Sequence, residues 1–400
     1  MKTPHPSLES KLFNRAATAE AASPLATERL LAPPKSFFAP GRPQLKMVIL
    51  GPANWRGEGA ASTYRGLARE LTLRGHDVFF LERGDGESAS QKTRGLEVGR
   101  VDDYLSLKDL KNRHAAAVRE ADFVLVASQI AEAAAIGDWI TRHAQGVTAF
   151  YDFNAAQTVS ALPQNRLDSI TVDLMPRYDL YFSFTGGPVL DHLEDDFGVR
   201  AAYPLYPAAD ARHFFPEYSQ TIWDFGYIGR HNEESMPVLE RLLLEPARRW
   251  EEGNFVVAGS SYPRSVRWPG NVKRIPQVSA QKRRSFYNAQ RFTLDITTPD
   301  FVAAGFSPSA RLFEAAACGT PIITEFWPGL DTFFTPDEEI LISHSPDETL
   351  IYLEEISELD RRRLGYRARE RVLARHTSRH RAIELEGHVL ELLRLSAGRD

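Results

Sequence analysis

The chain has 400 residues, of which 43% are hydrophobic and 25% charged, and its formal net charge is −5. This length suits two α/β domains rather than one core, and the slightly acidic balance argues against a protein that binds nucleic acid over its whole surface. The single cysteine, Cys318, excludes an intrachain disulfide and a cysteine-based zinc site. The histidines show no metal-ligand spacing, so we expect no metal site. From the net charge we expect no nucleic-acid partner.

Residues 1–45 are rich in Ala, Ser and Pro and contain no continuous apolar segment like that of a secretory signal. We therefore expect them to form a poorly ordered N-terminal extension. No apolar run approaches the roughly 18 to 20 residues that a membrane-spanning helix needs. The sequence therefore predicts a cytoplasmic location.

The first ordered unit is predicted to be a βαβ unit. An apolar strand over residues 46–50 stops at Gly51, and a loop with two glycines follows it. A helix then opens at Ser62 or Thr63, and the next strand covers residues 77–82.

Strand–helix alternation continues through both halves of the chain, which predicts two doubly wound parallel sheets with helices on both faces. A proline-containing segment, residues 203–221, has no clear periodicity and is interpreted as the interdomain connection. The predicted units are residues 46–202 as an N-terminal acceptor domain, 222–375 as a C-terminal donor domain and 376–400 as a helix that returns to the first domain. The later predicted strands are 122–127, 147–151, 178–184, 223–228, 255–258, 292–296, 321–324 and 340–343, and the later helices are 131–143, 236–250, 280–288, 309–317 and 357–395.

The loop after the first strand nearly matches the dinucleotide-binding pattern G-x-G-x-x-G. Gly57 and Gly59 fit, and Glu82 ends the second strand where an NAD ribose ligand would lie. The third glycine is replaced by Ser62, however, and the pattern starts too far from the strand end at Gly51. NAD binding is therefore a minor alternative.

The same loop suits an acceptor-side role at the carboxyl edge of the sheet. Its residues Asn54, Trp55, Gly57, Glu58 and Gly59 would then face a cleft. A plain surface loop is the other interpretation.

A second cluster opens a short helix in the C-terminal half. Ser307 and Ser309 form a turn and N-cap, so the helix offers free N–H groups and a positive dipole end to an anion such as a pyrophosphate. Arg311 lies in the first turn, where a cation is favourable only beside an anion. Glu314 can accept two hydroxyl hydrogen bonds, as a ribose diol requires. An ordinary capped helix with a surface Arg–Glu pair explains these residues equally well.

This segment resembles the donor-binding segment of GT-B glycosyltransferases, and most closely that of the CgeB/YkvP-like group. Weaker matches are Phe215-Pro216 in the connection, Gly229-Arg230 after the first donor-domain strand, and His376-Thr377 with Arg381 at the last helix. Segments 328–330 and 338–341 also match. The positions that carry the main resemblance are Arg311, Phe313, Glu314, Ala315, Ala317, Cys318, Gly319, Pro321 and Ile323.

The resemblance implies two Rossmann-like domains that face each other across a cleft, with a nucleotide diphosphate sugar as co-substrate and no bound metal or cofactor. Glu314 would bind the donor ribose, and Gly229 and Arg230 would face the diphosphate, with Ser307, Ser309 and Arg311 nearby. One departure is Phe306, which stands where retaining relatives carry the first glutamate of E-x7-E. Neither a donor-sugar contact there nor a retaining outcome is implied.

In the N-terminal half, Asp152 ends a strand and is the candidate general base if the enzyme inverts, because a carboxylate can take a hydroxyl proton. Relatives read closer to Y-D-x-D-T-P, so Asn154 departs from their pattern, and a capping role for Asp152 is an equal alternative. Gly186 and Gly187 precede a helix and would face acceptor or phosphate, unless they form a simple turn.

The sequence therefore predicts a metal-independent, hexosyltransferase-like glycosyltransferase that uses Arg230 and Arg311 to stabilise the departing diphosphate. Its acceptor would be a glycan, a lipid-linked molecule or a protein. The alternatives are a catalytically silent sugar-nucleotide-binding or scaffold protein, and an NAD-dependent enzyme or epimerase of similar fold. The basic run over residues 361–381 suits a solvated helix face or an interdomain clamp, and less often contact with an anionic membrane.

Overall fold

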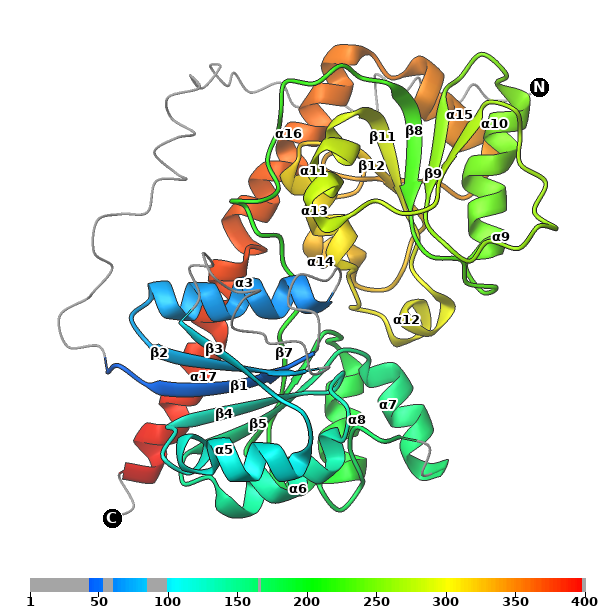
Figure 1. Ribbon diagram of the computed structural model, residues 1–400. Coiled ribbons are helices and arrows are strands. Elements are labelled where there is room, and N and C mark those ends of the chain that lie inside the picture. The colour runs from blue at the N-terminus through cyan, green and yellow to red at the C-terminus, as the bar shows by residue number, and fades with distance from the viewer. Residues whose placement is uncertain (1–42, 53–59, 85–98, 165–166, 398–400) are drawn as a thin grey trace.

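The computed structural model describes residues 43–52, 60–84, 99–164 and 167–397. Two α/β domains lie one above the other, and helix α3 (Ala60–Leu73) lies between the sheet of the first domain and the second domain (Figure 1). Residues 1–42, which carry nearly all of the expected N-terminal extension, lie outside the described residues.

The first domain is built on a seven-stranded sheet in which every neighbouring pair is parallel, in the order β3-β2-β1-β4-β5-β6-β7. The strands are β1 (Lys46–Gly51), β2 (Asp77–Arg83), β3 (Arg100–Tyr104), β4 (Phe123–Ala127), β5 (Val147–Asp152), β6 (Leu180–Ser183) and β7 (Ala202–Pro204). Besides α3, its helices are α5 (Leu107–Arg119), α6 (Ala133–His143), α7 (Ala155–Ala161) and α8 (Pro188–Phe197).

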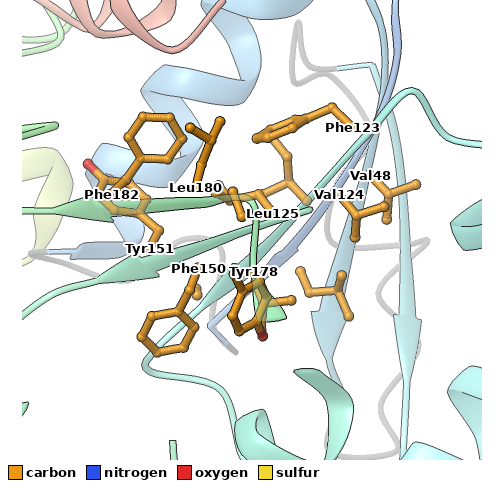
Figure 2. Packing of buried hydrophobic residues seen from close by; sticks show 14 of the residues in the cluster. Val48, Phe123, Val124, Leu125, Phe150, Tyr151, Tyr178, Leu180 and Phe182 are labelled. Carbon is orange, nitrogen blue, oxygen red and sulfur yellow. The ribbon is translucent and has the colours of Figure 1, made fainter. Parts of the chain in front are cut away.

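The central strands are apolar on both faces because helices cover both faces of the sheet. Every residue of β4 and of β5 is buried. Figure 2 shows the side chains of Phe150 and Tyr178 next to each other in this core, with their ring centroids 5.6 Å apart. The continuous hydrophobic runs seen in the sequence therefore mark the middle of the sheet.

The second domain repeats the architecture with a six-stranded parallel sheet in the order β10-β9-β8-β11-β12-β13. Its strands are β8 (Trp223–Ile228), β9 (Phe255–Ala258), β10 (Val272–Ile275), β11 (Gln290–Asp295), β12 (Ile322–Thr324) and β13 (Leu341–Ile342). Its helices are α9 (Met236–Leu239), α10 (Glu245–Arg249), α11 (Ala280–Asn288), α12 (Pro299–Ala304), α13 (Ala310–Ala317), α14 (Leu330–Phe333), α15 (Pro346–Glu355) and α16 (Glu358–Arg375). The two sheets confirm the predicted fold class of two Rossmann-like domains.

In each sheet the strand order reverses once, between β1 and β4 in the first domain and between β8 and β11 in the second. Chain connections leave toward opposite faces at such a point, which opens a crevice at the carboxyl ends of the two strands. These crevices are where ligands bind in doubly wound folds.

Several elements were not expected from the sequence. Strand β3 reads RVDDY and strand β10 reads VKRI, and both are edge strands whose polar residues hide the apolar pattern. Strand β7 takes up Tyr203 and Pro204, which the sequence assigned to the interdomain connection. By contrast, the helical segment over residues 357–395 divides into α16 and α17 (Ser378–Ala397) at His376-Thr377, where the sequence predicts that the terminal helix begins.

The chain crosses between the domains twice, and the two crossings lie side by side. Ala209 in the first crossing and Thr377 in the second form a parallel bridge. Helix α17 then packs against α3, and its residues Ala382, Leu385 and Val389 belong to the core of the first domain. The C-terminal helix is therefore structurally part of the N-terminal domain.

The basic run of the last helices is mostly neutralised by acidic neighbours. Arg361 and Arg362 both donate to Glu358, and these hydrogen bonds lower the pKa of Glu358 to about 2. Arg371 forms an ion pair with Glu339, which lies in the loop before β13. Within the described part of the chain, no helix is long and apolar enough to cross a membrane.

Candidate functional site

The crevice of the second sheet holds most of the predicted donor-binding residues. Arg311, in the first turn of α13, donates from Nη1 to the carbonyl oxygen of Ile228 at 2.8 Å and from Nη2 to that of Ile296 at 3.1 Å. These two carbonyls lie at or just past the carboxyl ends of β8 and β11, the strands that flank the switch point. Arg311 therefore spans the crevice directly beside Gly229, and its side chain remains 28% exposed.

The loop after β8 is held in place by the loop after β9. The amide of Gly229 donates to Ala258, and a Cβ on Gly259 would lie 1.9 Å from the Gly229 carbonyl oxygen. Gly259 has a φ of 151°, a conformation that side chains disfavour. The exposed side chain of Arg230 is directed by a 3.3 Å hydrogen bond from Nε to Ser261. This close approach leaves Gly229 and Arg230 at the mouth of the crevice.

Ser309 caps α13 and also contacts an acid at the end of β11. Its hydroxyl accepts from the amide of Leu312 at 3.1 Å and donates to Oδ1 of Asp295 at 2.8 Å. Asp295 is 3% exposed, and burial raises the pKa of its carboxyl. Its Oδ2 has no hydrogen-bond partner among the described residues, although Arg311 lies 3.7 Å from Oδ1. Sequence reasoning missed Asp295, whose only signal is an acid inside an apolar strand.

Glu314, the predicted ribose ligand, has an enclosed side chain in this structure. Its side chain is 2% exposed and pairs with the equally buried Arg283 of α11 at 2.9 Å. The pKa of Arg65, on α3 of the other domain, is lowered by burial. The negative charge of Glu314 acts in the opposite direction and raises it. In this structure the Glu314 carboxylate therefore forms a buried ion pair that joins α13 to α11. Arg65 and Arg283 were not singled out from the sequence because only the tertiary contact defines them.

The two domains touch at the loop that precedes α13. The amide of Gly186 donates to the carbonyl of Phe306 at 3.0 Å, and Ser307 Oγ donates to Thr185 Oγ1 at 3.0 Å. The ring of Phe306 is wedged between two glycines, since a Cβ on Gly187 or Gly329 would lie within 2.5 Å of it. The predicted acceptor-side glycines and the predicted donor-side serine are thus brought together.

Phe306 itself has a φ of 46°, the left-handed conformation that costs a bulky residue energy. Its amide donates to the carbonyl of Pro328 at 2.7 Å, so the conformation is fixed from both sides. The aromatic residue at the position of the first E-x7-E glutamate therefore makes an interdomain contact.

Asp152 lies at the end of β5 but is only 2% exposed. Its carboxylate accepts hydrogen bonds from the hydroxyl of Tyr181 and from the amide of Asn154. Burial raises the pKa of Asp152, and hydrogen bonds from Thr158 and Tyr181 act in the opposite direction. The carboxylate is therefore enclosed by protein groups, while the residue that caps α7 is Asn154, whose side chain accepts from the amide of Gln157.

Of the remaining predicted positions, Asn54, Trp55, Gly57, Glu58 and Gly59 lie outside the described residues. Glu82, the acid of the NAD alternative, is the second-last residue of β2 and lies opposite Gly51 of β1. The described part of the chain contains no group of three or more His, Cys, Asp or Glu side chains able to hold a metal ion.

Comparison with known proteins gives a family model that matches one segment of the chain. Residues 230–387 match the model of a glycosyl transferase-like family. The matched segment contains Arg230, Asp295, Ser309, Arg311 and Glu314, so it includes the crevice described above. A search of curated proteins gives no significant match.

Solved structures of similar fold cover nearly the whole chain. The alpha-glucosyltransferase in complex with UDP-glucose and DNA containing an abasic site has a TM-score of 0.66 and 13% identity, over 87% of this chain and 100% of that one. Anabaena HepE in complex with UDP-glucose has a TM-score of 0.64 and 12% identity, over 88% and 100%. Sucrose-phosphate synthase from Thermosynechococcus elongatus has a TM-score of 0.61 and 14% identity, over 88% and 100%. The chain has the GT-B fold and carries a glycosyl transferase-like region.

Proposed function

We propose that this protein is a glycosyltransferase that moves a sugar from a nucleotide diphosphate sugar to an acceptor. The observation that supports this most strongly is the position of Arg311, which spans the crevice at the switch point beside Gly229 and Arg230. The crevice lies inside the segment that matches the glycosyl transferase-like family. A UDP-sugar is the first donor to test, because the UDP-glucose complexes of HepE and of the alpha-glucosyltransferase share this fold.

The chemistry would be electrostatic. As the sugar leaves, negative charge develops on the diphosphate, and preorganised cations and amides near it lower the barrier. Arg230 is exposed at the crevice mouth, and the first amides of α13 follow Ser309, so both would face that charge. We propose that these groups take the place of a metal, and turnover should then be unchanged by a chelator.

The test is calorimetry and thermal shift with UDP, GDP, dTDP and NAD, followed by detection of nucleotide release from UDP-glucose. Wild type should bind one nucleoside diphosphate, and Arg230→Ala should weaken binding about tenfold, the scale of one lost charge-assisted contact. Arg362→Ala, an exposed arginine on α16, is the control and should bind as wild type does. Binding of NAD alone, or equal loss in both variants, would contradict the proposal.

Asp152 needs its own variant because two roles are open to it. A general base would lose about 10²- to 10⁴-fold in turnover as Asp152→Asn while the protein stays folded. A structural acceptor would lose thermal stability, with turnover falling only in proportion to the folded fraction. The burial of Asp152 favours the second outcome.

A second candidate is a catalytically silent sugar-nucleotide-binding protein. The features that favour it are Phe306 at the E-x7-E position and the enclosed Asp152. This candidate would be supported if the protein bound the donor but released no nucleotide with any glycan, lipid-linked or protein acceptor tested. A cytoplasmic location and membership in the CgeB/YkvP-like group remain parts of the proposal.

A further inference from the structure

One segment of the second domain has a charge balance unlike the rest of the chain. Residues 253–294 contain no Asp or Glu, although the whole chain carries more acidic than basic residues. The basic residues of this segment are Arg264, Arg267, Lys273, Arg274, Lys282, Arg283, Arg284 and Arg291. The predicted function uses none of them.

Three of these cations are committed to structural ion pairs. Arg283 pairs with Glu314, Arg284 with Glu217 and Arg291 with Asp224. The other five are exposed, and four of them lie in the β9–β10 loop or on β10. We name Arg264, Arg267, Lys273 and Arg274 the basic surface. Within the described part of the chain none of the four forms an ion pair.

Aromatic rings connect Arg274, one member of the basic surface, to the loop after β8. The guanidinium of Arg274 lies over the ring of Trp268 at 4.4 Å and near that of Tyr262 at 5.6 Å. Tyr262 donates its hydroxyl to the carbonyl of Gly229 at 3.0 Å. A stacked guanidinium loses mobility but keeps its N–H donors for an anion. Arg274 is therefore connected, through Tyr262, to the loop that is proposed to face the diphosphate.

A simpler explanation covers only part of this surface. β10 is the edge strand of the sheet, and exposed Lys or Arg on an edge prevents pairing with another chain. That accounts for Lys273 and Arg274. It does not account for Arg264 and Arg267, which precede the strand and lie in a loop. The nearest acids along the chain are Glu251 and Glu252, which precede β9, and Asp295, which ends β11.

We infer that the basic surface binds an anionic glycan, a sugar chain with phosphate or carboxylate groups, as the acceptor. This inference rests on the proposed function, because a chain held beside Gly229 would present its end to the donor crevice. The four cations and the neighbouring rings supply charge and contact area without reading a sequence. Association should weaken steeply as salt rises, since such contacts release counterions.

The test measures binding of a fluorescent heparin oligosaccharide, a model anionic glycan, to the full chain at about 50 and 200 mM salt. Arg264→Glu/Arg267→Glu should weaken binding at least about tenfold, since each cation near an anionic partner contributes several-fold. Arg362→Glu/Arg363→Glu on α16 changes the net charge equally and should stay within about threefold of wild type. Thermal unfolding checks that both variants fold.

Loss in the first variant only supports the inference. No binding by wild type, or equal loss in both variants, overturns it. Tighter binding of single-stranded DNA of equal charge would show that the surface serves nucleic acid and would also overturn the glycan assignment. Nucleoside diphosphate binding, measured on the same variants, should be unchanged. A failed glycan test with intact nucleotide binding would leave the proposed transferase standing.

Discussion

His376 shows how a single residue is decided by its surroundings. The sequence places it only at the start of the last helix, but the structure buries its ring against Phe313 with centroids 4.9 Å apart. Arg381 donates to its Nδ1 at 3.0 Å, so the imidazole must be neutral to accept. Burial, together with the charge of Arg381, lowers the pKa of His376 to about 3.

This neutral histidine makes stability depend on pH. Between its unfolded pKa of about 6.5 and its folded pKa of about 3, the unfolded chain binds a proton that the folded protein does not. Acidification over this window therefore favours unfolding. We expect wild type to lose more free energy of unfolding between pH 7 and about 5 than His376→Gln does. Urea unfolding at both pH values measures this, with exposed His344→Gln as control. Equal losses in all three proteins would contradict the assignment.

At the scale of elements, glycines decide which surfaces can meet. Gly187 begins α8 with a φ of 68°, and a Cβ there would lie 2.3 Å from the ring of Phe306. Gly198 ends the same helix with the same φ, but a Cβ there would meet only Pro176, at 3.8 Å. The two positions share a positive φ, but the ψ of −152° at Gly187 lies in a region almost confined to glycine, whereas the ψ of 23° at Gly198 is left-handed helical. They also differ in the interdomain contact.

We therefore expect Gly187→Ala to separate the domains and Gly198→Ala to leave them together. Gly198→Ala should lose about 1 kcal/mol from the positive φ, and Gly187→Ala should lose more, because its combination of φ and ψ is almost confined to glycine. Only Gly187→Ala should increase the radius of gyration in small-angle scattering, because it displaces Phe306. Phe306→Ala should remove this specific effect of Gly187→Ala. An identical scattering profile for both glycine variants would show that the contact does not hold the domains together.

The C-terminal helix is held by a buried charge as well as by apolar packing. Glu386 of α17 is fully buried, and Arg74 pairs with it at 2.5 Å. His76 lies 3.4 Å from the other carboxylate oxygen. Removing one member of such a pair leaves a buried charge uncompensated.

Glu386→Ala should lower the free energy of unfolding by about 3 to 5 kcal/mol. The exposed pair of Arg113 with Asp109 gives a control, because Arg113→Ala should cost less than about 1 kcal/mol. Chemical denaturation measures both. A loss near 1 kcal/mol for Glu386→Ala would mean that water solvates the Arg74 guanidinium left behind and that packing alone holds α17.

At the scale of the whole molecule, the interdomain contact and the crevice are parts of one loop. Residues from Gly305 to Ser309 touch Thr185 and Gly186 at one end and cap α13 at the other. Helix α12, which precedes this loop, also contacts α7 of the first domain. A ligand that orders the start of α13 should therefore also stabilise the contact between domains.

Nucleoside diphosphate binding should accordingly slow hydrogen exchange at Gly186, whose amide donates across the interface to Phe306. The expected change is slower exchange in the peptide that contains Gly186, with no change in α5, which is far along the sheet. Exchange mass spectrometry with and without the bound nucleotide measures this. Protection confined to residues near Arg311 would show that the crevice fills without engaging the first domain.

The sequence by itself determined the alternation of strands and helices and located the cap at Ser309, because apolar runs and capping residues are local signals. It also predicted that Gly229, Arg230 and Arg311 belong to one site, because all three match the donor-domain pattern of GT-B glycosyltransferases. Only the tertiary structure decided that Asp152 and Glu314 are enclosed, since burial depends on partners such as Tyr181 and Arg283 that are distant in the chain. The wedge of Phe306 between Gly187 and Gly329 was likewise set by the meeting of two domains. Edge strands β3 and β10 stayed hidden because half-exposed strands lack the apolar pattern, and pairing with a neighbour is what makes them strands.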